Sequence, residues 1–183
     1  VGRIVAGKPL DPALLTENLE AVRKGGENLA AQVELVHSYG VPVIVAINAF
    51  PTDTPAEHAA IRDVALAAGA RDAVVTTNFA DGGKGAEALA AAVWDAAASD
   101  GGSFHLLYPD EMPLREKIET IATKVYGAEG VDFAPAATKA LTEYEGLGYG
   151  HLPVCVAKTH LSLSHDPSVK GRPTGYRFPV RDV

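Results

Sequence analysis

The first hundred residues alternate short apolar runs with longer segments in which apolar residues recur every three or four positions. Residues 42–48 and 73–77 are continuous apolar runs, rich in β-branched side chains, without alternating polar positions. Runs of this kind are typical of parallel strands that are covered on both faces. Each run therefore predicts one buried strand of a parallel sheet.

The segments around these runs predict three helices, over residues 19–40, 57–68 and 86–98. We expect Thr16 to cap the first helix, because a side-chain oxygen at this position satisfies a free backbone N–H group. The Gly25–Gly26 pair lowers the stability of that helix by about 1 kcal/mol per residue relative to Ala, which is tolerable where the backbone packs close to a sheet. Strands and helices that alternate in this order predict an α/β fold with flanking helices.

The pattern changes after a glycine turn at residues 100–102. The remaining chain predicts a smaller α+β segment, and we expect one domain over residues 1–102 and a second over 103–183. The elements expected in this second domain are amphipathic helices over 113–126 and 135–145, a turn over 127–132 between them, a strand over 154–157, a polar loop over 158–175 and a strand-like segment over 176–181.

Composition narrows the class of protein. Apolar residues make up 47% of the 183 residues, far too many for a disordered chain. A net charge of −7 argues against nucleic acid or an anionic membrane as the main partner. No apolar run approaches the roughly 20 residues of a membrane span, and residues 1–9 contain no signal peptide. A single cysteine fits a reducing compartment, so we expect a soluble cytoplasmic protein that has been cut at both ends.

Two aromatic residues follow the predicted strands. Phe50 and Phe79 come one or two positions after a buried run, in loops at the carboxyl ends of the strands, where open parallel sheets bind ligands. The two rings either clamp a flat heteroaromatic ligand or fold back over the end of the sheet as core. Periodicity alone favours the core position.

Seven stretches resemble formate–tetrahydrofolate ligase, and they occur in the order of that family from about residue 16 to 183. They are NLEAV at 18–22, YGVPVIVAIN at 39–48, FPTDT at 50–54, KIETIA at 117–122, YGA at 126–128, LPVCVAKT at 152–159 and GRPTG at 171–175.

The resemblance implies ATP-dependent formylation of tetrahydrofolate, with Mg²⁺ shared by the phosphates of ATP and no bound prosthetic group. It further implies a P-loop-NTPase-like parallel sheet, small-molecule substrates, a homo-oligomer and a monovalent cation requirement. Paired aromatic residues of the family hold the pterin ring. By motif they fall on Phe50, next to Pro51, and on Phe79, where many relatives carry Trp. With the family in view, the folate clamp becomes the favoured role of the two rings.

The chain also departs from the family pattern. It contains no Gly-rich segment ending in Gly-Lys-Thr-Thr, and residues 82–85 lack the spacing of a phosphate-binding loop. Residues 3–10 stand where the family has a Lys- and His-containing stretch. We therefore expect a middle-to-late third of such an enzyme, which binds folate weakly and does not turn over. The alternatives are a non-catalytic folate-binding or structural module with the ligase fold, and an unrelated nucleotidase-like domain.

The remaining candidates are weaker, and no catalytic residue or metal site is assigned. Asn48 and Lys158 are candidate nucleotide contacts, whereas a capping role for Asn48 and Asp53 and a solvated Lys158 are the alternatives. Two histidines share the loop 158–175 with Ser162, Ser164 and Asp166, which suggests either a metal or hydrolytic site or a solvated loop; they are His160 and His165. We expect Cys155 to be an inert core thiol and Trp94 to contribute to packing.

Overall fold

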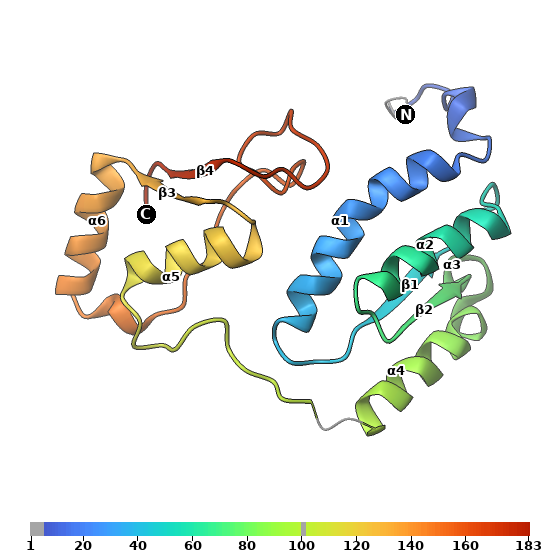
Figure 1. The fold of residues 1–183 in the computed structure, drawn as a ribbon, viewed down its shortest axis with the longest axis horizontal. Coiled ribbons are helices and arrows are strands. Elements are labelled where there is room, and N and C mark those ends of the chain that lie inside the picture. The colour runs from blue at the N-terminus through green and yellow to red at the C-terminus, as the bar shows by residue number, and fades with distance from the viewer. Residues whose placement is uncertain (1–5, 100–101) are drawn as a thin grey trace. The chain divides into compact units, whose positions relative to one another are not determined.

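The computed structural model describes residues 6–99 and 102–183 (Figure 1). Residues 3–5 of the stretch that departs from the family pattern, and residues 100–101 of the glycine turn, lie outside the described residues. The chain divides into two compact units, Val1–Phe104 and His105–Val183. Each unit contains its own two-stranded parallel sheet. The mixed α/β class expected from the sequence is therefore confirmed.

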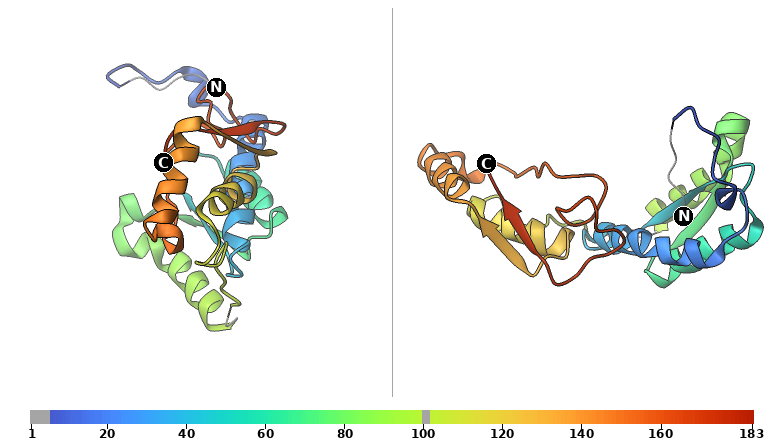
Figure 2. Two further views of the ribbon diagram at one scale, coloured as in Figure 1. Left: turned by 90° about the vertical axis from the view of Figure 1, so that its left-hand side faces the viewer. Right: turned by 90° about the horizontal axis from the view of Figure 1, so that it is seen from above.

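The first unit is built around strands β1 (Ile44–Asn48) and β2 (Asp72–Thr76). The two strands pair in parallel, with Ile44 opposite Asp72 and Asn48 opposite Thr76, so their carboxyl ends meet at one edge. Helices α1 (Leu19–His37) and α2 (Pro55–Ala67) pack together on one side of this sheet, and α4 (Glu87–Ser99) lies on the other (Figures 1 and 2). Both strands and all three helices predicted for this part of the chain are present.

The core of the first unit lies between the sheet and the α1–α2 pair. Its buried residues are Val33, Val43, Ile47, Ala65, Ala70 and Ala73. By contrast, the opposite side of the sheet is only partly covered, since Val75 is 42% exposed and Trp94 on α4 is 74% exposed. The expected packing role of Trp94 is wrong, because most of its side chain is exposed in this structure.

The start of α1 differs from the prediction. Asn18, rather than Thr16, is the N-cap: its side-chain oxygen accepts a hydrogen bond from the backbone N–H of Ala21 at 2.9 Å. The helix begins at Leu19, and Thr16 is too far from this first turn to satisfy its free N–H groups. A short 3₁₀ helix, Pro12–Leu14, precedes it.

The two glycines of α1 have opposite surroundings. A Cβ atom added at Gly26 would lie 2.9 Å from Val64 Cγ1 on α2, whereas one added at Gly25 meets nothing within 4 Å. Gly26 therefore allows close packing of two helices, and the expected approach to a sheet is wrong.

This contrast gives a matched pair of substitutions. Gly25→Ala is expected to raise the free energy of unfolding of the first unit by about 0.5–1 kcal/mol, because Ala restricts the unfolded chain and no neighbour opposes it. Gly26→Ala is expected to lower it by about 1–3 kcal/mol through overlap with Val64. Urea unfolding followed by the fluorescence of Trp94, the only tryptophan, measures both. Equal effects of the two substitutions would contradict the assigned packing.

The second unit contains α5 (Leu114–Thr120), which continues as one turn of π-helix (Ile121–Val125), and α6 (Pro135–Gly146). Strands β3 (Gly130–Phe133) and β4 (Arg177–Val180) pair in parallel, with Gly130 opposite Arg177. Helix α6 also leads into a 3₁₀ helix, Tyr149–His151. The core consists of Leu114, Ile118, Ala122, Ala128, Val131, Leu141 and Phe178.

Three expectations for the second unit need correction. The turn expected over 127–132 contains most of β3. The strand expected over 154–157 is not formed: within the described residues, these positions pair with neither β3 nor β4. Cys155 is exposed rather than a core thiol, and its neighbours Val154 and Val156 pack against the core instead.

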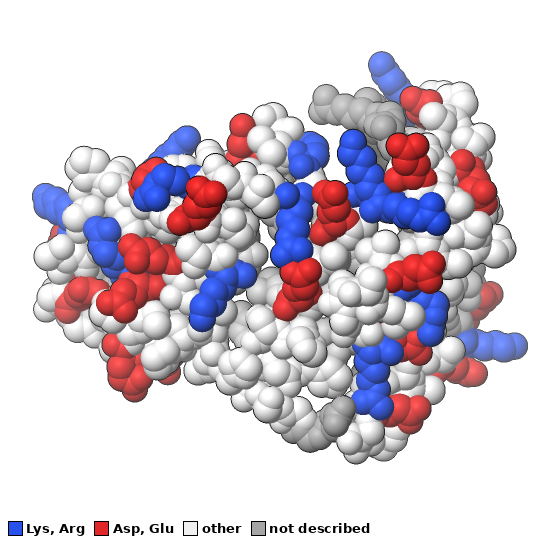
Figure 3. Space-filling view, in the orientation of Figure 1, with Lys and Arg blue, Asp and Glu red and all other residues white. Residues whose placement is uncertain are grey.

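The surface and the helices add two further facts. On the face that Figure 3 shows, Lys and Arg side chains are interspersed with Asp and Glu and do not form one basic patch. Among the described residues, no helix is both long enough and apolar enough to cross a membrane.

Candidate ligand-binding site

The carboxyl edge of the β1–β2 sheet presents both candidate aromatic residues. Phe50 follows β1 and is 63% exposed, and Phe79 lies on the short helix α3 (Asn78–Asp81) after β2 and is 95% exposed. The alternative that these rings fold back into the core is wrong for this structure. Exposed phenylalanine rings at this edge of a parallel sheet are available to contact a flat apolar partner.

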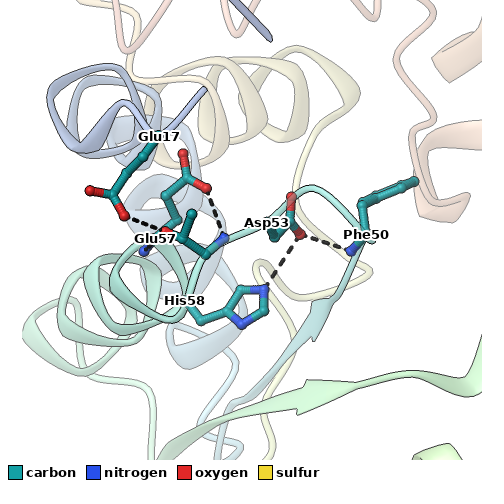
Figure 4. Close-up of polar contacts among 6 residues, drawn as sticks. Glu17, Phe50, Asp53, Glu57 and His58 are labelled. Atoms are coloured by element: carbon teal, nitrogen blue, oxygen red, sulfur yellow. Dashed lines mark hydrogen bonds and ion pairs between the residues drawn. The ribbon is translucent and has the colours of Figure 1, made fainter. Parts of the chain in front are cut away.

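Asp53 holds the loop that carries Phe50. Its Oδ2 atom accepts a hydrogen bond from the backbone N–H of Phe50 at 2.8 Å and lies 3.4 Å from Nε2 of His58 on α2. Figure 4 shows the Phe50 ring pointing away from both Asp53 and α2. The loop is therefore fixed through its backbone while its aromatic side chain stays free.

The residues that cap α2 also connect this loop to α1. Thr54, rather than Asp53, is the N-cap, and it forms a reciprocal capping box with Glu57. Glu57 Oε1 accepts a further hydrogen bond from the backbone N–H of Asn18 at 3.0 Å. Glu17 accepts one from the Thr54 hydroxyl at 2.6 Å (Figure 4). Two carboxylates thus fix the starts of α1 and α2 against the Phe50 loop.

The loop that carries Phe79 closes on itself. The Gly85 carbonyl accepts hydrogen bonds from the Thr77 backbone N–H at 3.1 Å and from the Thr76 hydroxyl at 3.0 Å. The Thr77 hydroxyl donates to Asp81 Oδ2 at 2.7 Å. In place of the loop expected after the second strand, α3 and a 3₁₀ helix, Gly82–Ala86, lead into α4. Phe79 is therefore presented from a closed turn.

Gly85 is required for this closure. A Cβ atom added there would lie 2.6 Å from the carbonyl carbon of Thr77, a backbone atom that cannot move alone. We expect Gly85→Ala to lower the free energy of unfolding of the first unit by about 1–3 kcal/mol. Gly83→Ala is the matched control, because nothing lies within 4 Å of its added Cβ and its φ is not positive. Urea unfolding followed by Trp94 fluorescence tests the pair, and a Gly85→Ala protein as stable as Gly83→Ala would contradict the close approach.

The other sequence candidates fall in different places. Asn48 is exposed at the end of β1, and its side chain makes no hydrogen bond to any described residue, so the expected capping role is wrong. Pro51 is exposed next to Phe50. Lys158 belongs to the second unit, where its ammonium donates to the carbonyls of Thr159 and Ser162 and lies 4.9 Å from the Tyr126 ring centroid. Burial lowers the pKa of Lys158 from its ordinary value.

The serine-rich loop has a structural arrangement. Ser164 is buried, its hydroxyl lies 2.9 Å from that of Ser162, and it accepts a hydrogen bond from the Asp166 backbone N–H at 3.1 Å. Hydrogen bonds from Ser168 lower the pKa of Asp166. Within the described part of the chain, no three His, Cys, Asp or Glu residues are grouped so that they could hold a metal ion. The loop is thus ordered by its own polar groups.

Sequence reasoning did not single out Lys117. This side chain is fully buried in the second unit, and its Nζ donates to the carbonyls of Asp110, Gly150 and Leu152 at 2.6, 2.8 and 3.0 Å. The available signal was a lysine within the apolar stripe of the predicted helix, next to Ile118.

An α/β unit with two exposed aromatic rings at the carboxyl edge of a parallel sheet has the arrangement of a domain that binds small molecules. A family model described as formate–tetrahydrofolate ligase matches residues 4–183. The chain belongs to the formate–tetrahydrofolate ligase family.

Curated relatives that carry the name formate–tetrahydrofolate ligase agree with this family. The chain is 55% identical to the one from Saccharopolyspora erythraea over 181 residues, which are 99% of this chain and 32% of the relative. It is 54% identical to the one from Roseiflexus castenholzii, covering 98% of this chain and 32% of the relative. The relative from Desulforamulus reducens is 52% identical over 100% of this chain and 32% of its own length. The chain thus spans about a third of these relatives.

Proposed function

We propose that this chain supplies the pterin-binding face of an ATP-dependent formate–tetrahydrofolate ligase. The observation that carries the proposal is the pair of exposed rings, Phe50 and Phe79, which two hydrogen-bonded loops hold at one sheet edge in a member of this family. A pterin ring stacked between them would bury apolar area on both of its faces. Pro51 would contact the edge of the same ring.

The proposed reaction has two steps. A formate oxygen attacks the terminal phosphorus of ATP, ADP leaves, and formyl phosphate forms. The N10 atom of tetrahydrofolate then attacks the formyl carbon, and inorganic phosphate leaves. Phosphoryl transfer depends mainly on the positioning of the substrates and on stabilisation of charge. Residues of this chain can therefore contribute to the reaction by binding and positioning the substrates. Phe50 and Phe79 orient the folate. Asn48 is a proposed nucleotide contact in the first unit, and Lys158 is a separate proposed nucleotide contact in the second unit. ATP arrives with Mg²⁺ as a substrate complex.

Several finer features belong to the same proposal. We infer that β1 and β2 are part of a larger P-loop-NTPase-like sheet, because a typical sheet has five or six strands and this one has two. Residues 1–102 and 103–183 are proposed as parts of two domains. A monovalent cation requirement, a homo-oligomeric assembly and a cytoplasmic location complete it, and family membership supports all three.

Calorimetric titration of the chain with tetrahydrofolate tests this function. The expected result is weak but saturable binding, with no formation of 10-formyltetrahydrofolate when ATP and formate are added, because the 183 residues contain no Gly-x4-Gly-Lys-Ser/Thr segment. Absence of tetrahydrofolate binding would overturn the pterin-binding role and favour a structural module. Binding of ATP without binding of tetrahydrofolate would favour a nucleotidase-like domain. Formyl transfer by the chain alone would contradict the proposal that the chain binds folate without catalysing the reaction.

A further inference from the structure

A groove of about 650 Å³ opens in the second unit, between two stretches of the chain. Residues 154–159 form one flank, and residues 178–183, which include the end of β4, form the other. The remaining lining is mainly apolar and consists of Ile118, Ala122 and Tyr126, together with His165. Figure 2 (right-hand view) shows both flanks, β4 near the C-terminus and the stretch that follows α6. Each flank is as long as an ordinary strand of five or six residues.

The first flank has the burial pattern of a strand. Val154 and Val156 pack on the core, whereas Cys155 and Ala157 are exposed, as the alternation of a strand requires. The Val154 backbone N–H has no strand partner among the described residues and donates to the Tyr108 hydroxyl at 3.1 Å.

This bond fixes the direction of the neighbouring backbone groups. Successive residues of a strand direct their N–H and C=O groups to opposite sides. In that pattern, the N–H and C=O groups of Cys155 and Ala157 face away from Tyr108, which does not line the groove, whereas Cys155 and Ala157 both do. These groups have no hydrogen-bond partner among the described residues.

The second flank has the same property. The carbonyls of Tyr176 and Val180 accept hydrogen bonds from Glu129 and Ala134, at the two ends of β3. Even-numbered residues of β4 therefore direct their backbone groups towards β3, and Pro179 directs its backbone groups the other way. Pro179 lines the groove, as does Arg181 just beyond the end of β4. Pro179 has no N–H group, so this edge of β4 offers an interrupted row of donors.

We propose that this groove is the position of one β-strand, which joins β4 to residues 154–157 and completes a four-stranded sheet. Its occupant is an extended segment with apolar residues at alternate positions, because only one face of the inserted strand would lie on the mainly apolar lining of the groove. Both neighbours would supply backbone hydrogen bonds. The sheet would then run from β3 through β4 and the inserted strand to residues 154–157.

The segment comes from the two thirds of the family's polypeptide that lie outside these residues, because the chain covers only 32% of each relative compared. A sheet of only two parallel strands is smaller than the sheets that are stable alone. A further strand from a polypeptide three times longer would therefore stabilise it. A second copy of this chain fits less well. In a second copy, the two free strand edges are the flanks of that copy's own groove. Neither edge is therefore available as a single strand to enter the groove of another copy.

Residue-resolved hydrogen exchange tests the proposal by comparing this chain with the full-length relative from Saccharopolyspora erythraea, which is 55% identical over 181 residues. In the full-length protein, the amides equivalent to Cys155, Ala157 and Arg181 are expected to exchange about 100-fold more slowly than in this chain. The amide equivalent to Val156, directed away from the groove, gains much less protection. Amides in the middle of α6 serve as the control and exchange at similar rates in both proteins.

Each other outcome overturns the proposal. Fast exchange at both flanks of the full-length protein means that no strand lies in the groove. Uniform protection of residues 154–157, including Val156, indicates a cover that does not pair as a strand. If the flank amides are already protected in a sample of this chain by itself, and this protection disappears on dilution, the occupant of the groove is a second copy. Because the comparison needs no substitution, a variant that fails to fold does not affect it.

Discussion

Replacing Phe50 or Phe79 with Ala is expected to weaken tetrahydrofolate binding to this chain roughly 30-fold in each case. The estimate combines about 1.5 kcal/mol or more for burial of an aromatic ring with about 0.5–1.5 kcal/mol for ring stacking. Both rings are largely exposed without ligand, so their truncation removes contacts with the ligand and few contacts within the protein. Calorimetry of the parent and the two variants measures the loss, and urea unfolding is expected to change by less than about 0.5 kcal/mol.

Two further variants sharpen this test. Trp94→Ala removes another large exposed ring of the same unit, on α4 rather than at the strand ends, and is expected to leave folate affinity unchanged. Phe79→Trp is expected to tighten binding severalfold, because indole offers a larger stacking surface. The clamp is wrong if Trp94→Ala weakens binding as much as Phe79→Ala, or if both Phe variants bind as the parent does.

The first unit was predictable in detail because its signals are local. The runs over 42–48 and 73–77 are too apolar for anything but buried strands, and strand order follows from short connections. Thr54 and Glu57 have the spacing of a capping box, a local signal for the start of α2 that the expected start at residue 57 did not use. The rule that ligands bind at the carboxyl ends of parallel strands then led to Phe50 and Phe79 without any contact information.

The second unit was less predictable because its sheet is non-local. β3 has four residues, and its partner β4 begins 47 positions after β3 starts, since Gly130 lies opposite Arg177. No pattern within one window reports such a pairing. Residues 154–157 show the converse case, since their alternation is that of a strand but no described residue pairs with them. The predicted N-cap of α1 was wrong for another reason. Thr16 and Asn18 are both residue types that cap helices well, and Asn18, the residue that caps α1, also has a tertiary contact with Glu57.

The burial of Lys117 could not be predicted from its residue type. A lysine in a predicted amphipathic helix is normally assigned to the solvated face, because lysine is almost never fully buried without partners. Here the partners are three carbonyls, two of them 33 and 35 residues later in the chain. An ammonium group has three donors, and all three are used. The buried charge thereby joins α5 to the segment before it and to the 3₁₀ helix Tyr149–His151.

Lys117→Met is expected to lower the free energy of unfolding of the second unit by about 3–5 kcal/mol. Methionine fills a similar volume but leaves three carbonyls without the donor that satisfied them, and buried groups that lose a charged partner are costly. The two units can be followed separately in urea. Trp94 fluorescence reports the first unit, and near-ultraviolet circular dichroism of tyrosine reports mainly the second, which contains all the tyrosines except Tyr39.

Lys124→Met is the matched control, because Lys124 is exposed on the same helical segment and is expected to change stability by less than about 0.5 kcal/mol. A Lys117→Met protein in which tyrosine dichroism is lost while Trp94 keeps its native fluorescence would support the same role, since only the second unit would then be unfolded. If Lys117→Met and Lys124→Met unfold at the same urea concentration, the three carbonyls do not depend on this ammonium, and the second unit is held by its apolar core alone.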